Sequence, residues 1–329
     1  MYTLLFFFFP FFLSADSNPI ELGKINWNRN YDTAIQQAIK ESKPVFILFQ
    51  EVPGCSTCRQ YGQGVLSHPF IVEAIEDEFI PLAIFNNKNG HDSDILKRFH
   101  EPSWNNPVAR IVDQDGQALA DRVAGNYSEL AVVDAITSAL TQAGREVPNY
   151  LSLYREQLIA EENEAEVALS MYCFWSGEKE IASIKGVVAT EAGFMDGKEV
   201  VKVRYNKKDV SAKTIANSAA QVNCADGAYV RSTSDHFTFK NAETKTYSRY
   251  RKDVHNKYYL YNSNYKYVPM LPIQELKVNR ALATNQDPDA LLSPRQLELL
   301  DKFKTTPKSK LKSRISIDFV DSWYGVLAE

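Results

Sequence analysis

The stretch from Val45 to Arg59 constrains the fold more than any other part of the chain. It reads Val-Phe-Ile-Leu-Phe-Gln-Glu-Val-Pro-Gly-Cys-Ser-Thr-Cys-Arg, an apolar run followed by a Pro-Gly turn and two cysteines with two residues between them. This pattern predicts a buried β-strand that delivers a dithiol to the start of a helix. A helix N-terminus carries partial positive charge, which favours a thiolate at the first cysteine. We therefore expect Cys55 to be the attacking sulfur and Cys58 to be the resolving one.

A Cys-x-x-Cys pair is also half of a zinc site, which needs two further ligands at metal spacing. Cys173 and Cys224 each stand alone in the sequence, and the five histidines are scattered. Covalent haem attachment requires a histidine at the position of Arg59. We therefore expect redox chemistry at the dithiol, with no metal and no other cofactor.

The first residues of the chain, Met1 to Ala15, indicate export. They contain a phenylalanine-rich apolar run that ends in Leu-Ser-Ala before Asp16, a small-residue cleavage pattern. The run is shorter than the roughly 20 residues that a membrane-spanning helix requires. We expect a cleaved signal peptide and a periplasmic or secreted protein without stable membrane insertion. Because no Lys or Arg precedes the apolar run, an uncleaved N-terminal membrane anchor is the alternative.

The composition is that of a globular chain with room for two domains. Its 329 residues are 44% hydrophobic and 24% charged, which is enough to bury a sizeable core. Tyrosines alternate with Lys, Arg and Asn between Tyr247 and Tyr267, but the net charge of −4 argues against a nucleic-acid partner. The alternation over residues 257–261 instead predicts paired strands. Four cysteines are too few for a disulfide-stapled scaffold, so chemistry explains them better.

Around the dithiol, apolar periodicity predicts an alternation of helices and strands. Helices are expected over residues 27–43, 70–79, 94–99 and 127–143, and strands from Val45 and over residues 80–85, 105–112 and 117–123. With a further helix at Cys58, this order is the arrangement of a thioredoxin fold, and it accounts for residues 25–145.

The dithiol segment resembles thioredoxin-like proteins of a subgroup marked by Val-Pro-Gly-selenocysteine-x-x-Thr. This chain reads Val52-Pro53-Gly54-Cys55-Ser56-Thr57-Cys58, with sulfur in place of selenium and a cysteine in place of the threonine. The resemblance implies a selenoprotein homologue whose single redox atom has become a complete dithiol. In thioredoxins a cis-proline facing the dithiol shapes the substrate-binding groove, and Pro107 matches that position. The strand before the dithiol lacks the buried aspartate usual in thioredoxins.

A second cysteine stands at a predicted strand-to-helix junction. Val167 to Trp175 is an apolar run that we expect to form a strand, and Ser176-Gly177-Glu178 opens a helix. This repeats the arrangement of the first site, although no resolving cysteine follows. On these residues alone, Cys173 is explained equally well as a buried structural cysteine between two core aromatics.

Residues 172–178, Tyr-Cys-Phe-Trp-Ser-Gly-Glu, resemble the Gly-Cys-Phe-Trp-Gly-x-Glu signature of A-type peptide methionine sulfoxide reductases. The similarity continues through residues 184–194 and 198–206, and it implies an α+β domain of the ferredoxin-like type. In this family the matching cysteine attacks the sulfoxide and becomes a sulfenic acid, which assigns that role to Cys173. The residues implied beside it are Phe174 and Trp175 around the substrate methyl group, Glu199 as the proton donor to the sulfoxide oxygen, and Cys224 as a resolving thiol or an idle one.

Two departures from this family leave the activity of the second domain open. Between Phe194 and Lys198 the chain has only Met-Asp-Gly, where the family carries a longer loop that includes an active-site tyrosine. The later Gly-Thr-Gln-Tyr-Arg-Ser segment of the family has only an out-of-register counterpart in residues 226–232.

The sequence thus predicts an α/β protein in which a thioredoxin fold precedes a domain of the methionine sulfoxide reductase type. We expect it to be an exported thiol-disulfide oxidoreductase whose dithiol recycles the second domain, held close to it by fusion. The alternative is a thioredoxin-like thiol-exchange or binding protein whose second domain has lost the reaction. The expected partners are oxidised proteins or peptides, carrying methionine sulfoxide or disulfides, and an upstream thiol reductant. The expected parts are a signal peptide (1–15), a thioredoxin-like domain (16–146), a solvated linker helix (147–166), the reductase-like domain (167–245) and a C-terminal extension of unassigned function (246–329).

Overall fold

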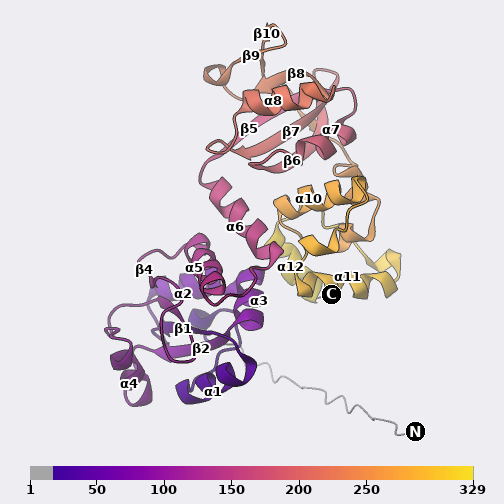
Figure 1. The fold of residues 1–329 in the computed structure, drawn as a ribbon. Helices are drawn as coiled ribbons and strands as arrows, with labels where there is room; N and C mark the ends of the chain where they lie inside the picture. Colours follow the sequence, from indigo (N-terminus) through magenta and orange to yellow (C-terminus); the bar gives the residue numbers. More distant parts are fainter. Residues whose placement is uncertain (1–17, 329) are drawn as a thin grey trace, which may run out of the picture.

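The computed structural model describes residues 18–328, so the expected signal peptide lies outside the described residues. Figure 1 shows an α/β half formed by the first part of the chain, a second α/β half above it, and helices between the two. Among residues 18–328, none of the helices combines the length and the apolar character that crossing a membrane requires. The helices between the halves are α6 (Asn149–Glu161), α9 (Tyr258–Tyr261), α10 (Pro272–Ala283), α11 (Pro294–Thr305) and α12 (Phe319–Ala328).

The N-terminal half is a four-stranded sheet of order β2-β1-β3-β4, in which β1 is parallel to β2 and antiparallel to β3. All six residues of β1 are buried because helices cover both faces of the sheet. Phe46 and Leu48 pack in one core cluster with α3 and α5, while Ile47 and Phe49 pack in another with α1 and α4. The elements are α1 (Tyr31–Glu41), β1 (Val45–Gln50), α2 (Ser56–Gln63), α3 (Pro69–Glu78), β2 (Ile80–Phe85), α4 (His91–Arg98), β3 (Val108–Val112), β4 (Val123–Ala124) and α5 (Glu129–Gln142).

The hairpin expected after β3 is largely absent. Of the strand expected over residues 117–123, the structure keeps a bridge between Ala118 and Val112 and the short β4, which pairs with β3. The segment between them leaves the sheet, where Arg122 binds the buried carboxylate of Glu101 at 2.7 Å. The strand was expected to extend over residues 117–123 because apolar periodicity does not reveal the ion pair between Arg122 and Glu101.

The second half is a six-stranded sheet of order β11-β8-β5-β7-β6-β12. Its four central strands follow the chain order β5-α7-β6-β7-α8-β8 and pair with one another in antiparallel fashion. Helices α7 and α8 share one core cluster with the sheet. The elements are β5 (Glu164–Met171), α7 (Phe174–Ile181), β6 (Val187–Met195), β7 (Lys198–Asn206), α8 (Ala212–Gln221), β8 (Ala225–Val230), β9 (Thr238–Phe239), β10 (Ala242–Glu243), β11 (Lys245–Thr246) and β12 (Arg251–Lys252).

Two expectations about element type or length are wrong. The strand expected over residues 167–175 ends at Met171, and Phe174 and Trp175 belong to the first turn of α7. The paired strands expected over residues 257–261 are absent, because these residues form α9. Both errors have the same cause: a short apolar or alternating run fits a strand and a buried helical turn equally well.

Helix α6 is also not the solvated connection that we expected. Tyr150, Leu151 and Tyr154 are buried, and they belong to the same core cluster as α3 and the C-terminal helices. The second half is joined to this layer as well, since Val188 of β6 lies in that cluster and Leu276 of α10 lies in the core of the second half. The C-terminal helices therefore contribute to the core clusters of both halves.

Aromatic side chains make the contact between the C-terminal helices and the N-terminal half. The rings of His68 and Tyr154 stack with centroids 4.3 Å apart, and those of Phe70 and Phe319 are 4.5 Å apart. Burial lowers the pKa of His68 to about 3, so its ring is neutral and packs as an aromatic. On α11, Arg295 binds Glu76 of α3 at 2.7 Å.

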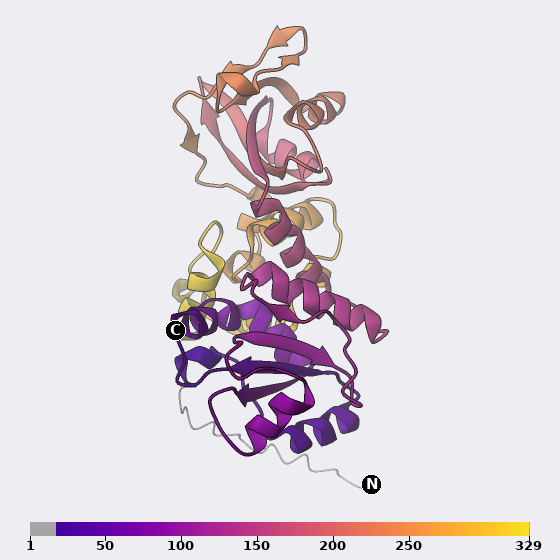
Figure 2. The same ribbon diagram turned by 90° about the vertical axis from the view of Figure 1, so that its left-hand side faces the viewer.

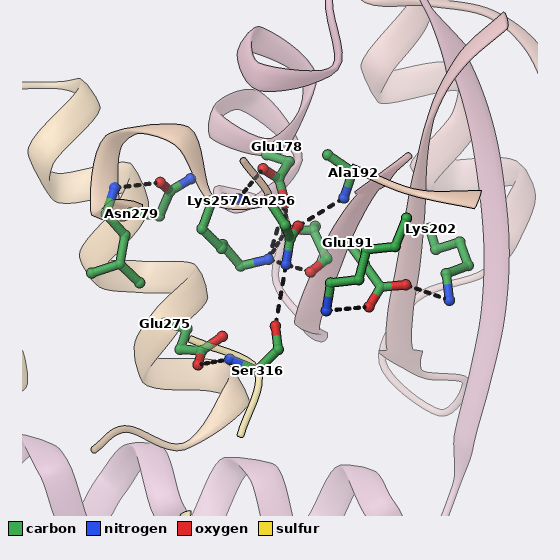
Figure 3. Close-up of polar contacts among 12 residues, drawn as sticks. Glu178, Glu191, Ala192, Lys202, Asn256, Lys257, Glu275, Asn279 and Ser316 are labelled. Carbon is green, nitrogen blue, oxygen red and sulfur yellow. Dashed lines mark hydrogen bonds and ion pairs between the residues drawn. The ribbon is translucent and has the colours of Figure 1, made fainter. Parts of the chain in front are cut away.

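Buried polar groups make the contact with the second half (Figure 3). Lys257 is 1% exposed, and its Nζ lies 3.0 Å from Oε1 of the fully buried Glu178 and also contacts Thr190. The neighbouring Asn256 accepts a hydrogen bond from the Ala192 amide of β6 at 2.9 Å. A buried charge without its partner is strongly destabilising, so Lys257 and Glu178 hold the start of α9 against α7 and β6.

We expect the aromatic contact to stabilise the whole molecule. Phe319 is 4% exposed, so Phe319→Ala is expected to lower the free energy of unfolding by about 3–5 kcal/mol because it leaves a cavity between α3, α6 and α12. Leu327 lies on the same helix and is 60% exposed, so Leu327→Ala serves as the control, with an expected change within about 0.5 kcal/mol. Urea denaturation followed by tryptophan fluorescence measures both. Equal stabilities of the two variants would contradict a shared core.

Candidate functional site

The dithiol lies at the N-terminus of α2, where the turn after β1 places it. Cys55 is the N-cap residue and is exposed, whereas Cys58 is one turn further into the helix and is fully buried. Both are free thiols, and their Sγ atoms are 3.5 Å apart. A modest shift of the side chains therefore forms a disulfide, whose S–S length is about 2.05 Å.

The two thiols differ in acidity. The backbone N–H of Cys58, which points to the Cys55 sulfur from the first turn of the helix, lowers the pKa of Cys55 against a smaller opposing effect of burial. Burial raises the pKa of Cys58 to about 11, and the nearby Cys55 sulfur acts in the same direction. Cys55 is therefore the sulfur that carries negative charge more readily and that solvent and partners can reach.

The segment before β3 faces the dithiol. The Asn106–Pro107 peptide bond is cis, as the thioredoxin resemblance predicts for Pro107. Pro107 itself is buried, and the Cys58 thiol donates a hydrogen bond to Oδ1 of Asn106 at 2.7 Å. The Val52–Pro53 bond in the turn before Cys55 is also cis, which the sequence did not indicate. Trp104 in the same loop as Asn106 is 80% exposed.

Two polar residues behind the dithiol escaped the sequence analysis. Gln50, the last residue of β1, is fully buried, and its Nε2 donates to the carbonyl oxygens of Glu21 and Cys58 at 2.8 and 3.2 Å. The carboxylate of Glu21 in turn accepts a hydrogen bond from the Gly54 amide at 2.9 Å. The buried aspartate usual in thioredoxins is absent from β1, but a glutamate from a distant segment binds the turn that precedes Cys55. Glu21 lies in a three-residue 3-10 helix, and no sequence pattern marks it.

A second carboxylate lies close to the dithiol. A carboxylate oxygen of Glu51 and the Sγ atoms of Cys55 and Cys58 all lie within 4.8 Å of one another. Glu51 is half-buried and follows β1 directly. The sequence did contain this residue next to the motif, but only the turn at Pro53 brings its side chain back to the cysteines.

In the second half, the structure brings Cys173 and Glu199 together. Cys173 is half-buried and is the N-cap residue of α7, so its side chain lies at the end of β5. Glu199 lies on β7 opposite Met171 of β5, and its Oε2 accepts a hydrogen bond from the Phe174 amide at 2.9 Å. The carboxylate therefore contacts the helix terminus that Cys173 begins.

Cys224 lies at the same end of the sheet. Ala225 of β8 pairs with Met171, which places Cys224 beside the segment that leads to Cys173. Burial raises the pKa of Cys224, with further contributions in the same direction from Glu180 and Cys173. A surface cavity of about 460 Å³ is lined by both Glu199 and Cys224, together with Lys198, Asp226 and Lys240.

The two aromatics expected at this site are arranged differently from the expectation. Phe174 is 5% exposed and packs in the core against Phe194, so it presents little surface to a ligand. Trp175 is half-buried and stacks on Tyr258 of α9, with ring centroids 4.1 Å apart. Tyr258 belongs to the C-terminal extension, to which the sequence analysis assigned no function. A tyrosine therefore does lie beside Trp175, but it comes from a different segment than in the reductase family.

The two sites do not face each other. In Figure 1, α2 lies in the lower half of the molecule and α7 in the upper half, with α6 and the C-terminal helices between them. The orthogonal view in Figure 2 shows the same separation of the two sheets. The expectation that fusion holds the dithiol close to Cys173 is therefore wrong for this arrangement of the chain.

We expect alkylation rates to report the difference between the two thiols. The rate at Cys55 in the reduced protein should rise with a midpoint below the free-cysteine value of about 8.5, and Cys58 should remain slow until well above that pH. Reaction with iodoacetamide at a series of pH values, followed by peptide mass mapping, measures both thiols in one sample. Faster alkylation of Cys58 than of Cys55 would show that the helix terminus does not control their acidity.

A comparison with protein families supports the assignment of residues 26–113. A family model described as thioredoxin-like matches residues 26–113. No curated protein matches the chain. The similar solved structures include a DsbH oxidoreductase, which is 17% identical with a TM-score of 0.32, the match covering 38% of this chain and 90% of that chain.

Two further solved structures are similar to a comparable share of the chain. A thioredoxin from Thermus thermophilus is 18% identical with a TM-score of 0.32, and the match covers 36% of this chain and 90% of that chain. A putative disulphide-isomerase from Bacteroides thetaiotaomicron is 15% identical with a TM-score of 0.30, and the match covers 37% of this chain and 96% of that chain. The family match ends before β5, so it does not reach Cys173. Residues 26–113 form a thioredoxin-like domain that carries the Cys55–Cys58 pair.

Proposed function

We propose that this chain is an exported thiol-disulfide oxidoreductase of the selenoprotein-related type that acts on oxidised proteins or peptides through Cys55 and Cys58. The observation that carries the proposal is the pair itself, an exposed sulfur 3.5 Å from a buried one at the start of a helix in a thioredoxin-like domain. Export is supported by the apolar run before Asp16.

The geometry defines the steps of the exchange. The Cys55 thiolate attacks a disulfide of the partner, forms a mixed disulfide and releases one partner thiolate. Cys58 then loses its proton and attacks the Cys55 sulfur, which releases the second partner thiolate and leaves the Cys55–Cys58 disulfide. An upstream thiol reductant restores the dithiol. Asn106 contacts Cys58, and the exposed ring of Trp104 two residues earlier in the same loop offers an apolar surface to the partner.

Two cysteine variants test this order of attack. Cys55→Ser should abolish reduction of a disulfide substrate such as insulin, because the exposed nucleophile is gone. Cys58→Ser should retain the first attack and accumulate a mixed disulfide with the substrate, because no resolving thiol remains. Non-reducing electrophoresis with mass spectrometry identifies the trapped species. If Cys58→Ser turned over like the wild type, the assigned roles would be wrong.

We propose a second reaction for the other half, reduction of methionine sulfoxide at Cys173 in a ferredoxin-like domain of the A-type reductase kind. The strand order β8-β5-β7-β6 with the connections β-α-β-β-α-β supports the fold, and the contact of Glu199 with the start of α7 supports the site. Cys173 attacks the sulfoxide sulfur while Glu199 protonates the oxygen. The oxygen passes to Cys173 as a sulfenic acid and the substrate leaves as a thioether. Cys224 then condenses with the sulfenic acid, forming a disulfide and water.

The separation of the two sites affects how the Cys55–Cys58 dithiol could reduce an oxidised Cys173. The two sites lie in opposite halves of the molecule, so we propose that electrons pass from the dithiol of one molecule to the oxidised Cys173 site of another. The alternative function is a thioredoxin-like exchange or binding protein whose second half is inactive, and the shortened segment after Phe194 favours it.

Complementation between two variants tests both the second reaction and its electron source. One variant carries Cys173→Ser and Cys224→Ser, the other Cys55→Ser and Cys58→Ser. With the pre-reduced first variant as the only reductant, the second should convert methionine sulfoxide to methionine at a rate proportional to the concentration of the first. Chromatography measures the methionine formed. Replacing Glu199 by Gln in the second variant should slow the reaction by about 10² because the general acid is lost. Absence of both methionine and a sulfenic acid adduct at Cys173 would establish the alternative.

A further inference from the structure

The Glu51–Cys55–Cys58 cluster suits a metal ion as well as a disulfide. All three ligand atoms lie within 4.8 Å of one another, and the two sulfurs are 3.5 Å apart. Two thiolates bound tetrahedrally at a Zn–S distance of about 2.3 Å stand about 3.8 Å apart, so the cysteines need to separate by only a few tenths of an ångström. Two of the ligands, Cys55 and Cys58, were recognised in the sequence. The third, Glu51, comes close to them because the chain turns at Pro53.

We propose that the reduced dithiol binds one Zn²⁺ ion through Cys55 Sγ, Cys58 Sγ and a carboxylate oxygen of Glu51. Two thiolates and one carboxylate are ligands that zinc accepts, and the exposed side of Cys55 leaves a fourth position for water. Binding displaces the thiol protons, so the ion replaces them at the sulfurs.

The residues around the cluster are suited to hold these ligands. Cys58 is fixed in the interior, where its carbonyl accepts a hydrogen bond from Gln50 and its sulfur contacts the side chain of Asn106. When the sulfur binds the ion as a thiolate, a flip of the Asn106 side-chain amide turns its N–H group toward the sulfur, which then accepts a hydrogen bond. Glu21 binds the Gly54 amide and so keeps the turn between Glu51 and Cys55 in place.

Zinc binding and disulfide exchange exclude each other at this site, and this consequence rests on the proposed exchange function. With the ion bound, both sulfurs are occupied and Cys55 is not free to attack. A partner disulfide that oxidises the pair takes up two electrons and becomes two thiolates, while Cys55 and Cys58 form one S–S bond and the ion is released. The site would therefore hold zinc only in its reduced state.

Titration of the reduced full chain with Zn²⁺ tests the proposal. The protein carries Cys173→Ser and Cys224→Ser so that only the dithiol supplies thiols, and a chromogenic chelator competes for the metal without oxygen present. We expect one ion per chain, no binding after oxidation to the disulfide, and an affinity about 10–100-fold lower in Glu51→Gln. Glu146→Gln is the control, because it removes an exposed carboxylate outside the cluster; its affinity should change no more than about threefold.

The outcomes separate this inference from the exchange function. Equal zinc affinity of Glu51→Gln and the parent protein would overturn the proposed ligand set, and failure of the reduced protein to bind zinc would overturn the site. Loss of insulin reduction in the metal-free parent would instead contradict the exchange function, whatever the zinc result.

Discussion

Burial of β1 on both faces is the constraint on which the dithiol depends. Phe46 and Leu48 pack toward α3 and α5, and Ile47 and Phe49 pack toward α1 and α4, so the strand has no freedom to shift its register without exposing one set. The strand therefore ends at a fixed point, and the chain turns through Pro53 into α2 at that point. Gln50 and Glu21 then satisfy the polar groups behind the turn. The acidity of Cys55 follows from this placement rather than from any charged neighbour.

The C-terminal helices have a comparable role for the molecule as a whole. They are held to the N-terminal half by aromatic packing around His68 and Phe319, and to the second half by the buried pair Lys257 and Glu178. The first contact consists mainly of packed aromatic rings, whereas the second is a buried ion pair in which removal of either charge leaves the other unpaired. Together they fix the distance between the two thiol sites.

Short sequence patterns predicted most helices and strands of the N-terminal half, but they did not predict which segments far apart in the chain contact one another. The apolar run from Val45 and the two cysteines form one continuous segment, and the thioredoxin resemblance pointed to Pro107, so all of them could be found from the sequence. Glu21 and Tyr258 could not, because each reaches its site from a distant segment and neither carries a local mark. The same limit explains α6: its helical period was visible, but its burial depends on Phe70 and Phe319, which lie far away in the chain. Glu51 is an intermediate case. Its position next to the dithiol motif was visible in the sequence, but the turn at Pro53 determines that its side chain lies near the two cysteines.

The stacking of Tyr258 on Trp175 links the second site to the C-terminal helices. The indole face that Tyr258 covers is not available to a ligand at the same time, so a ligand that needs this face must compete with an intramolecular aromatic contact. Its apparent affinity is then lowered by the fraction of molecules in which Tyr258 is in place. By linkage, such a ligand would loosen α9, and Lys257, the residue before it, would transmit that change to the buried charge on Glu178. A ligand that binds this face of Trp175 would therefore also weaken the contact between α9 and the second half of the molecule, because both depend on whether Tyr258 is stacked on Trp175.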